Sequence, residues 1–194
     1  MTFRRLLPAA LAIVLLNGCA FGDSAKEAAE QLRNHYEASP SLQAEGEVLA
    51  EYGQRAYCYT VEIQGSEEAG SLTVTAPESI AGTGTAWQNG ETVLDYEGIS
   101  LETGALSPDG LSPADGIPVL LCALRSGSVA EYGWTDWGEA EHCLYLLLDN
   151  PNTENHDSQI AVWGDAESGT LYHAELLWQE KRVLSFTFSR FVLQ

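Results

Sequence analysis

Apolar and polar residues alternate through most of the chain, which predicts antiparallel strands with one buried face. The pattern is clearest around Asn89-Gly90, a dipeptide typical of a two-residue hairpin turn. Leu72, Val74 and Ala76 alternate with polar residues before this turn, and Thr92, Leu94 and Tyr96 do so after it. Further strands are expected over 48–52, 57–63, 92–97, 99–106, 142–149, 160–162, 172–178 and 184–189. A sheet therefore dominates the fold.

Two segments instead have the spacing of an amphipathic helix. Residues 23–39 place Ser24 and Glu27 at the spacing of a capping box, ahead of an alanine-rich apolar face that suits close packing on a sheet. In the second segment Ser112 is a predicted N-cap, and Pro113 takes the first helical position. The apolar faces comprise Ala25, Ala28, Ala29, Leu32 and Tyr36 in the first helix, and Ile117, Leu120, Leu121 and Leu124 in the second. Together with the strands, these helices indicate the α+β class.

Two stretches of the remaining chain have a less definite pattern. Residues 142–149, HCLYLLLD, are apolar on both faces, which is typical of a central strand covered by a helix on one side. Residues 126–141 are the least regular segment, and Trp134 and Trp137 are expected either to flank the core or to lie on an exposed loop.

The N-terminus has the pattern of a secretion signal. Two arginines precede an apolar run from Leu6 to Leu16, which is too short for a permanent transmembrane helix but suits a signal peptide. The ending Leu16-Asn17-Gly18-Cys19 resembles a bacterial lipobox, in which the cysteine becomes acylated. We therefore expect a signal peptide over 1–18, a lipidated tether over 19–23 anchored to the membrane at Cys19, and one domain over 24–194. An ordinary signal cleaved nearby, with Cys19 unmodified, is the alternative.

Charge restricts the partners of the protein. The chain has 194 residues and a net charge of −19, and loss of Arg4 and Arg5 with the signal makes it about −21. A field of this sign repels phosphates, so nucleic acid is not an expected partner. The acidity fits either a basic partner or simple solubility.

No motif in the sequence indicates catalysis or metal binding. A nucleophile elbow, a phosphate loop, a dinucleotide fingerprint and a zinc-protease motif are all missing, and residues 149–157 lack the spacing of a calcium loop. Chance pairs of carboxylates are unavoidable in so acidic a chain, so such pairs are not evidence for a glycosidase. Because the catalytic and metal motifs are missing, we expect a non-enzymatic protein with no metal and no cofactor. None of the four histidines lies in a recognisable triad: they are His35, His142, His156 and His173.

Three cysteines remain after Cys19, an odd number for an exported protein. They are Cys58, Cys122 and Cys143. One disulfide, with Cys122 and Cys143 as the pair to test first, and three buried thiols both fit the sequence; burial as small core residues is the expectation.

Three segments resemble the lipoprotein-carrier (LolA/LolB-like) superfamily, and more closely its clostridial, lipid-anchored germination lipoproteins (the GerS-like branch). These segments are 73–82, 94–113 and 174–191, within a resemblance that covers about residues 24–194. The resemblance implies an incomplete antiparallel β-barrel of about ten or eleven strands, with the N-terminal and middle helices packed in its concave side. It also implies a partner-binding role, with a cell-wall amidase as the partner in the germination branch. No functional residue is carried over, because no ligand-contacting motif matches.

Two functions follow as hypotheses. The first is a membrane-anchored envelope protein that binds a protein partner, with sporulation or germination as the expected process. The second is a binder or carrier of lipid acyl chains in the barrel concavity, because five aromatic residues are expected to face one interior. These residues are Tyr57, Tyr59, Trp178, Phe186 and Phe188. A cavity of several hundred cubic ångströms would favour the second function, and a packed interior would favour the first.

Overall fold

The computed structural model describes residues 20–39, 41–52, 54–96, 99–102, 112–153 and 157–194. Its elements are α1 (Ala20–Ala38), β1 (Ser41–Tyr52), β2 (Arg55–Ser66), β3 (Ala69–Ala76), η1 (Glu78–Ile80), β4 (Gly84–Gln88), β5 (Glu91–Tyr96), β6 (Ile99–Glu102), α2 (Pro113–Ser126), β7 (Val129–Trp137), β8 (Ala140–Asp149), β9 (Ser158–Gly164), β10 (Leu171–Trp178) and β11 (Lys181–Leu193). The predicted signal peptide and Cys19 lie outside the described residues.

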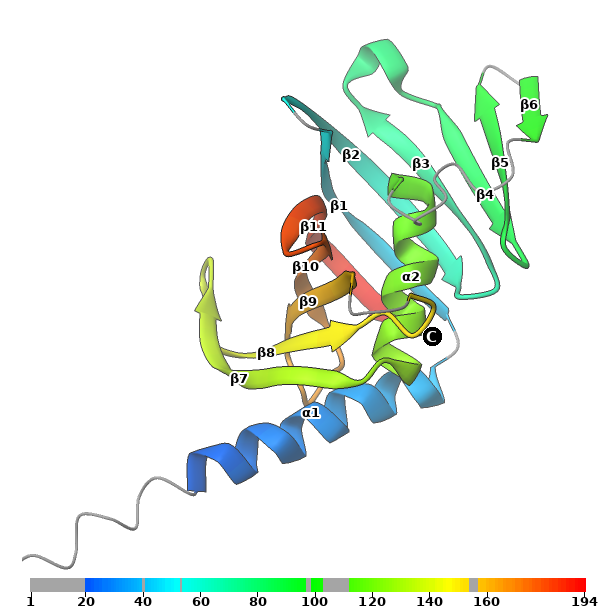
Figure 1. The fold of residues 1–194 in the computed structure, drawn as a ribbon. Coiled ribbons are helices and arrows are strands. Elements are labelled where there is room, and N and C mark those ends of the chain that lie inside the picture. The colour runs from blue at the N-terminus through cyan, green and yellow to red at the C-terminus, as the bar shows by residue number, and fades with distance from the viewer. Residues whose placement is uncertain (1–19, 40, 53, 97–98, 103–111, 154–156) are drawn as a thin grey trace, which may run out of the picture.

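All described strands form one antiparallel sheet of eleven strands, in the order β6-β5-β4-β3-β2-β1-β11-β10-β9-β8-β7. The first and last strands of the domain, β1 and β11, pair at the centre, so the sheet joins an N-terminal half to a C-terminal half. The sheet curves around α2, and α1 lies along the β7 side (Figure 1). Because β6 and β7 do not pair, the barrel stays open, as expected.

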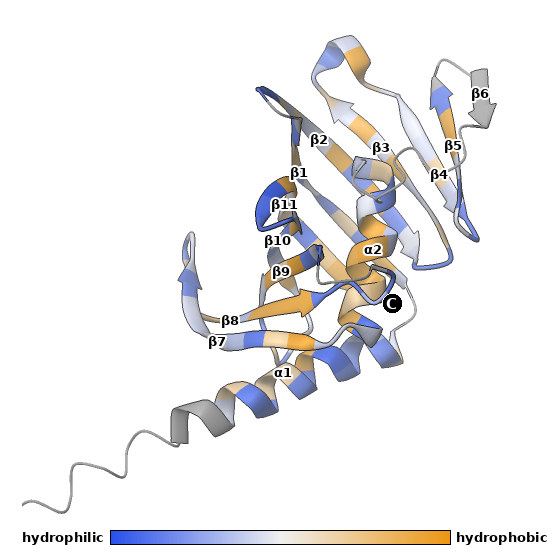
Figure 2. Ribbon diagram, in the orientation of Figure 1, coloured by the Kyte–Doolittle hydropathy of each residue, from blue (hydrophilic) through white to orange (hydrophobic). Residues whose placement is uncertain are grey.

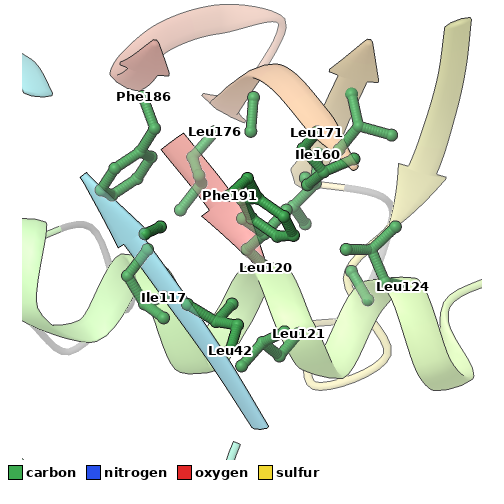
Figure 3. Packing of buried hydrophobic residues seen from close by; sticks show 14 of the residues in the cluster. Leu42, Ile117, Leu120, Leu121, Leu124, Ile160, Leu171, Leu176, Phe186 and Phe191 are labelled. Atoms are coloured by element: carbon green, nitrogen blue, oxygen red, sulfur yellow. The ribbon is translucent and has the colours of Figure 1, made fainter. Parts of the chain in front are cut away.

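The core lies between the concave face of the sheet and the two helices. From α2, Ile117, Leu120 and Leu124 are fully buried, and they meet side chains of β1, β9, β10 and β11 (Figure 3). Gly116 lets α2 approach β11 closely, since a Cβ there would lie 3.1 Å from the Phe186 ring. Figure 2 shows the middle of β8 as strongly hydrophobic, whereas hydrophobic and polar residues alternate along α1. All five residues of the predicted apolar face of α1 are buried.

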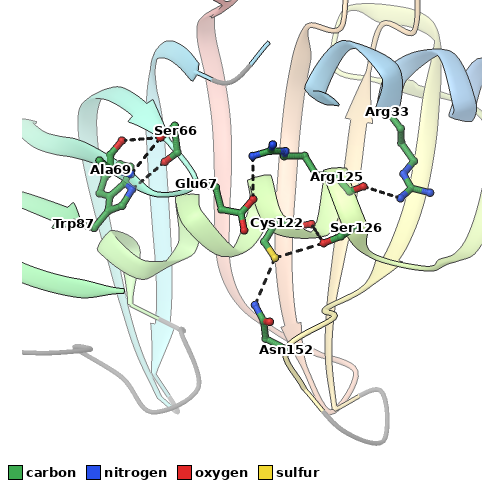
Figure 4. Close-up of polar contacts among 9 residues, drawn as sticks. All are labelled: Arg33, Ser66, Glu67, Ala69, Trp87, Cys122, Arg125, Ser126 and Asn152. Atoms are coloured by element: carbon green, nitrogen blue, oxygen red, sulfur yellow. Dashed lines mark hydrogen bonds and ion pairs between the residues drawn. The ribbon is translucent and has the colours of Figure 1, made fainter. Parts of the chain in front are cut away.

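Polar contacts at the C-terminal end of α2 join the two helices and the sheet (Figure 4). Arg33 of α1 donates from Nε to the Leu124 carbonyl at 3.0 Å and from Nη2 to the Arg125 carbonyl at 3.1 Å. The last carbonyls of a helix lack partners within the helix, so Arg33 satisfies two of them and places a positive charge at the negative end of α2. Arg125 in turn pairs with Glu67 in the β2–β3 turn at 3.3 Å.

Local signals in the sequence are confirmed at two of the three predicted caps and turns. Asn89 and Gly90 have φ angles of 52° and 85° and join β4 to β5 as a tight hairpin. Ser112 is the N-cap of α2, and its hydroxyl accepts a hydrogen bond from the Asp115 backbone N–H. The predicted cap at Ser24 is wrong: α1 begins at Ala20, and Ser24 instead accepts a hydrogen bond from Trp134 Nε1.

Two predictions for the C-terminal half also need correction. Residues 126–141 were the least regular by pattern, yet residues 129–137 form β7, an edge strand whose register slips twice against β8. These bulges break the two-residue period, so alternation is lost although the segment is a strand. The apolar β8 is the second strand from the edge rather than central.

Candidate binding surfaces

The five predicted cavity aromatics share the concave face of the sheet but do not surround one space. Val48 pairs with Tyr59 on one side and Phe186 on the other, which places these rings on one face. Phe186 is 1% exposed and its ring stacks on that of Phe188 at 6.1 Å, so this pair fills the core. Tyr57 is 39% exposed, and Trp178 is half-buried at the end of β10.

Of these five residues, only Tyr59 lines an apolar crevice of about 240 Å³, here called the concave crevice. The crevice lies between strands β2–β5 and the N-terminal end of α2, and its other lining residues are Val61, Leu72, Val74, Ile80, Thr83, Thr85, Leu94, Pro113 and Ala114. The Thr85 hydroxyl is buried and has no hydrogen-bond partner among the described residues. Burial, and secondarily the nearby Tyr57, raises the pKa of Tyr59 above its ordinary value.

A larger hollow lies on the opposite, convex face of the sheet. It has a volume of about 560 Å³ and crosses strands β7 to β10; we call it the convex groove. Its lining residues are Ala130, Glu131, Tyr145, Leu147, Gln159, Ala161, Trp163, Glu175, Leu177 and Glu180. Because both described helices pack on the concave side, neither covers this groove (Figure 1).

Aromatic rings support one side of the convex groove. Tyr145 and Trp163 have ring centroids 5.1 Å apart, and Trp163 also lies 5.0 Å from Trp137. Trp137 stacks on His173 at 3.9 Å, and His173 is 3% exposed. The cluster is thus a layer of rings on the sheet surface, with His173 beneath it.

Hydrogen bonds fix His173 and the carboxylate next to it. His173 Nδ1 lies 2.9 Å from the Thr187 hydroxyl, and Nε2 lies 3.4 Å from Glu175 Oε1. A carboxylate can only accept, so Nε2 carries the hydrogen in this pair. Arg182 contacts the same Glu175 oxygen at 3.0 Å and also pairs with Glu51 at 2.6 Å. The hydrogen bond from His173, followed by the contacts with Arg182, lowers the pKa of Glu175 despite partial burial.

The groove has a negative potential. Besides Glu175, its rim holds Glu131 on β7 and Glu180 in the β10–β11 hairpin, and no described lysine, arginine or histidine forms an ion pair with either. Burial raises the pKa of the Tyr145 phenol, and the charges of Glu131 and Glu175 raise it further.

Sequence reasoning missed the convex groove, although a signal for it was present. Apolar residues on both faces of β8 were interpreted as burial under a helix on one side. The outward positions of β8 and β9, which include Tyr145, Leu147 and Trp163, line an uncovered surface instead. Trp137 and His173 also belong to the aromatic cluster beside the groove. Their place in it depends on strand pairing, which alternation alone does not reveal.

The cysteines are all free in the described structure. Cys122 and Cys143 are buried and unpaired with each other, so the disulfide considered for them is not formed. Cys122 Sγ lies near the Ser126 hydroxyl and the Asn152 amide, at 3.7 and 3.5 Å (Figure 4). Cys58 is exposed, contrary to the expectation that all three are core residues, because its side chain lies on the convex face of β2.

No group of three or more potential metal ligands is close enough to hold an ion in the part of the chain that is described. Neither described helix is long and apolar enough to cross a membrane.

No protein-family profile and no curated protein matches the chain. Several solved structures, in contrast, match the chain. A LolA superfamily protein from Nitrosomonas europaea is 13% identical over 88% of this chain and 93% of its own, with a TM-score of 0.45. A chain of the Pseudomonas aeruginosa MucA/MucB complex is 12% identical over 85% and 56%, with a TM-score of 0.43. A chain of the complex between the CwlD amidase and the GerS lipoprotein of Clostridioides difficile is 12% identical over 87% and 92%, with a TM-score of 0.35. At these values the likeness concerns architecture, and no function of this chain follows from it.

Proposed function

We propose that this chain is a lipid-anchored envelope protein that acts, without catalysis, by binding another protein on the convex face of its sheet. The convex groove carries the proposal, because it is a hollow larger than the concave crevice and no described helix covers it. Its volume of about 560 Å³ is sufficient for several side chains of a partner. The anchor would be Cys19, which directly precedes α1 and would hold the domain close to the membrane surface.

The packing of the concave side supports this function over lipid carriage. Phe186, Leu120 and Ile117 fill the space between α2 and the sheet, and each is at most 1% exposed. The concave crevice, at about 240 Å³, is below the usual range of pockets for drug-sized ligands, which begins near 300 Å³.

Site-specific photo-crosslinking in the native host tests the protein-binding function. A photoreactive amino acid would replace Leu147 in the groove or Glu62 elsewhere on the convex face, and Glu30 on the exposed side of α1 would be the control position. We expect the two sheet positions to give an adduct of one defined protein mass, and Glu30 to give none. Adducts at none of the three positions, or equally at all three, would count against it. A cell-wall amidase is the first candidate to test because of the sequence resemblance described above.

The lipid anchor needs its own test. Metabolic labelling with a radioactive fatty acid should label the chain, and Cys19→Ser should abolish both the label and recovery in the membrane fraction. A labelled Cys19→Ser protein would show that acylation occurs elsewhere.

Binding of an apolar ligand in the concave crevice is a second candidate function, favoured by one observation. The unpartnered Thr85 hydroxyl lies in a crevice that is otherwise largely apolar, so a ligand with an apolar body and one polar group would satisfy it. Native mass spectrometry on residues 20–194, purified without detergent, tests this. A co-purifying lipid that is lost in Val74→Trp would support the candidate, and an apo mass would oppose it.

A further inference from the structure

We propose that the convex groove recognises an arginine-bearing segment of the protein partner, with a guanidinium lying against Tyr145 and Trp163 and held by the rim carboxylates. The inference rests on the proposed function, since it specifies the chemistry of the partner. The strand order β7-β8-β9-β10 places Glu131 at one side of the groove and Glu175 and Glu180 at the other, with the two rings between them.

The aromatic rings favour a flat cation. Tyr145 and Trp163 are half-buried and tilted by 52° to each other, and both line the groove. The negative face of an aromatic ring attracts a cation, and Trp does so most strongly. A guanidinium also stacks on such a ring through its plane, which the compact and strongly hydrated ammonium of lysine does not do.

The carboxylates favour a positive charge over a neutral ligand. Arg182 already neutralises part of the Glu175 charge, but no described cation pairs with Glu131 or Glu180. Among the residues that line the groove, none is basic. A neutral sugar could stack on the same rings, but it would leave this negative potential uncompensated. Charge complementarity therefore selects a cationic segment.

The dimensions of the groove suit a peptide. From β7 to β10 there are three strand spacings, or about 14 Å, which four residues of an extended chain also span. Apolar residues of the groove, among them Leu147, Ala161 and Leu177, supply a floor for the aliphatic stem of an arginine side chain. A segment with two arginines can thus reach the carboxylates at both sides.

Peptide binding to the full chain in detergent micelles tests the inference. The probe is a dye-labelled peptide, Gly-Arg-Gly-Arg-Gly with blocked ends, and its neutral match carries citrulline in place of each arginine. We expect saturable binding of the arginine peptide by fluorescence anisotropy, weaker binding at higher salt, and at least fivefold weaker binding of the citrulline peptide.

Two exposed carboxylates provide a variant that leaves the fold intact. Glu131→Gln with Glu180→Gln removes two rim charges and no described ion pair, and it should weaken binding of the arginine peptide by roughly two- to thirtyfold. Glu30→Gln with Glu91→Gln removes the same charge from exposed positions on α1 and β5, and it should change binding by less than about twofold. Trp163→Leu should weaken the arginine peptide more than a lysine peptide.

Any one of three results would overturn the inference. They are equal affinity for the arginine and citrulline peptides, absence of binding, and an unaltered affinity in the Glu131/Glu180 variant. Failure of the proposed function is separately visible. A protein adduct at Glu62 that persists in the Glu131/Glu180 variant would show that a partner binds the sheet without the groove chemistry. If no protein adduct forms at Glu62 or Leu147, the proposed function fails even where the peptide binds.

Discussion

Truncation of Phe186 distinguishes a filled core from a ligand cavity on the concave side. The side chain is 1% exposed, and its ring contacts the backbone position of Gly116 in α2 and the ring of Phe188. Phe186→Ala would remove the whole ring from a site where α2 and the sheet are already in close contact. The helix is tied to its neighbours near both ends, by the hydrogen bond from the Thr92 hydroxyl of β5 to the Asp115 carboxylate at 3.1 Å and by Arg33 of α1, so it cannot readily move inward to close the void.

The expected cost is large for a domain of this size. Phe-to-Ala substitutions in cores reduce the free energy of unfolding by about 3–5 kcal/mol. Because the void here cannot easily collapse, we expect about 4 kcal/mol. Since whole domains have only about 5–15 kcal/mol of stability, this loss should be visible as a shift of the entire unfolding transition.

Urea unfolding of residues 20–194, followed by tryptophan fluorescence, measures the change. The midpoint should fall while the denaturant slope stays constant, because the surface exposed on unfolding hardly changes. Val192→Ala is the control on the same strand: Val192 is 40% exposed on the opposite face and should alter stability by about 0.5 kcal/mol or less. A decrease in the free energy of unfolding of less than about 1.5 kcal/mol for Phe186→Ala would refute the packed-core interpretation and favour a ligand cavity.

Three further predictions concern pH, capping and a turn. The pKa of Glu175 is lowered, chiefly by the hydrogen bond from His173, so its carboxylate stabilises the fold above the ordinary value of 4.5 and this contribution is lost as the pH falls through the lower folded pKa. Glu175→Gln should therefore reduce the fall in the unfolding midpoint that the wild-type protein shows between neutral and acidic pH. If the midpoint of the variant falls as steeply as that of the wild type, other groups cause the fall. Ser112→Ala should cost about 1 kcal/mol in urea unfolding, and Ser112→Asn should restore most of it if the cap is the cause. Gly90→Ala should cost about 1–2 kcal/mol, because Gly90 has a φ of 85° and a Cβ there meets no atom within 4 Å, so only backbone strain acts. Gly133→Ala, equally unobstructed but without a positive φ, should be neutral, and equal costs would contradict this reasoning.

The candidate sites show where sequence reasoning stops. Five aromatics were grouped because their positions alternate, and the structure does place them on one face. Whether such residues surround a space or fill it depends on how closely α2 approaches, and that distance is set by Gly116, whose role no alternation pattern discloses. The groove on the other face was missed because its residues come from four consecutive strands, β7 to β10, and which of these residues lie side by side depends on a strand register that alternation does not fix.

The sequence by itself determined the local features: the strands with a clean two-residue period, the apolar faces of both helices, the cap at Ser112 and the hairpin at Asn89-Gly90. Each depends on interactions between residues near in the chain, which periodicity and turn chemistry report directly. Only the tertiary structure decided that β1 pairs with β11, that β7 is a bulged edge strand, and that Tyr145 and Trp163 line the same groove as Glu131 and Glu180. The pairing of β1 with β11 joins the two ends of the domain, and all three features depend on strand register, where a shift of one residue exchanges the two faces of a strand.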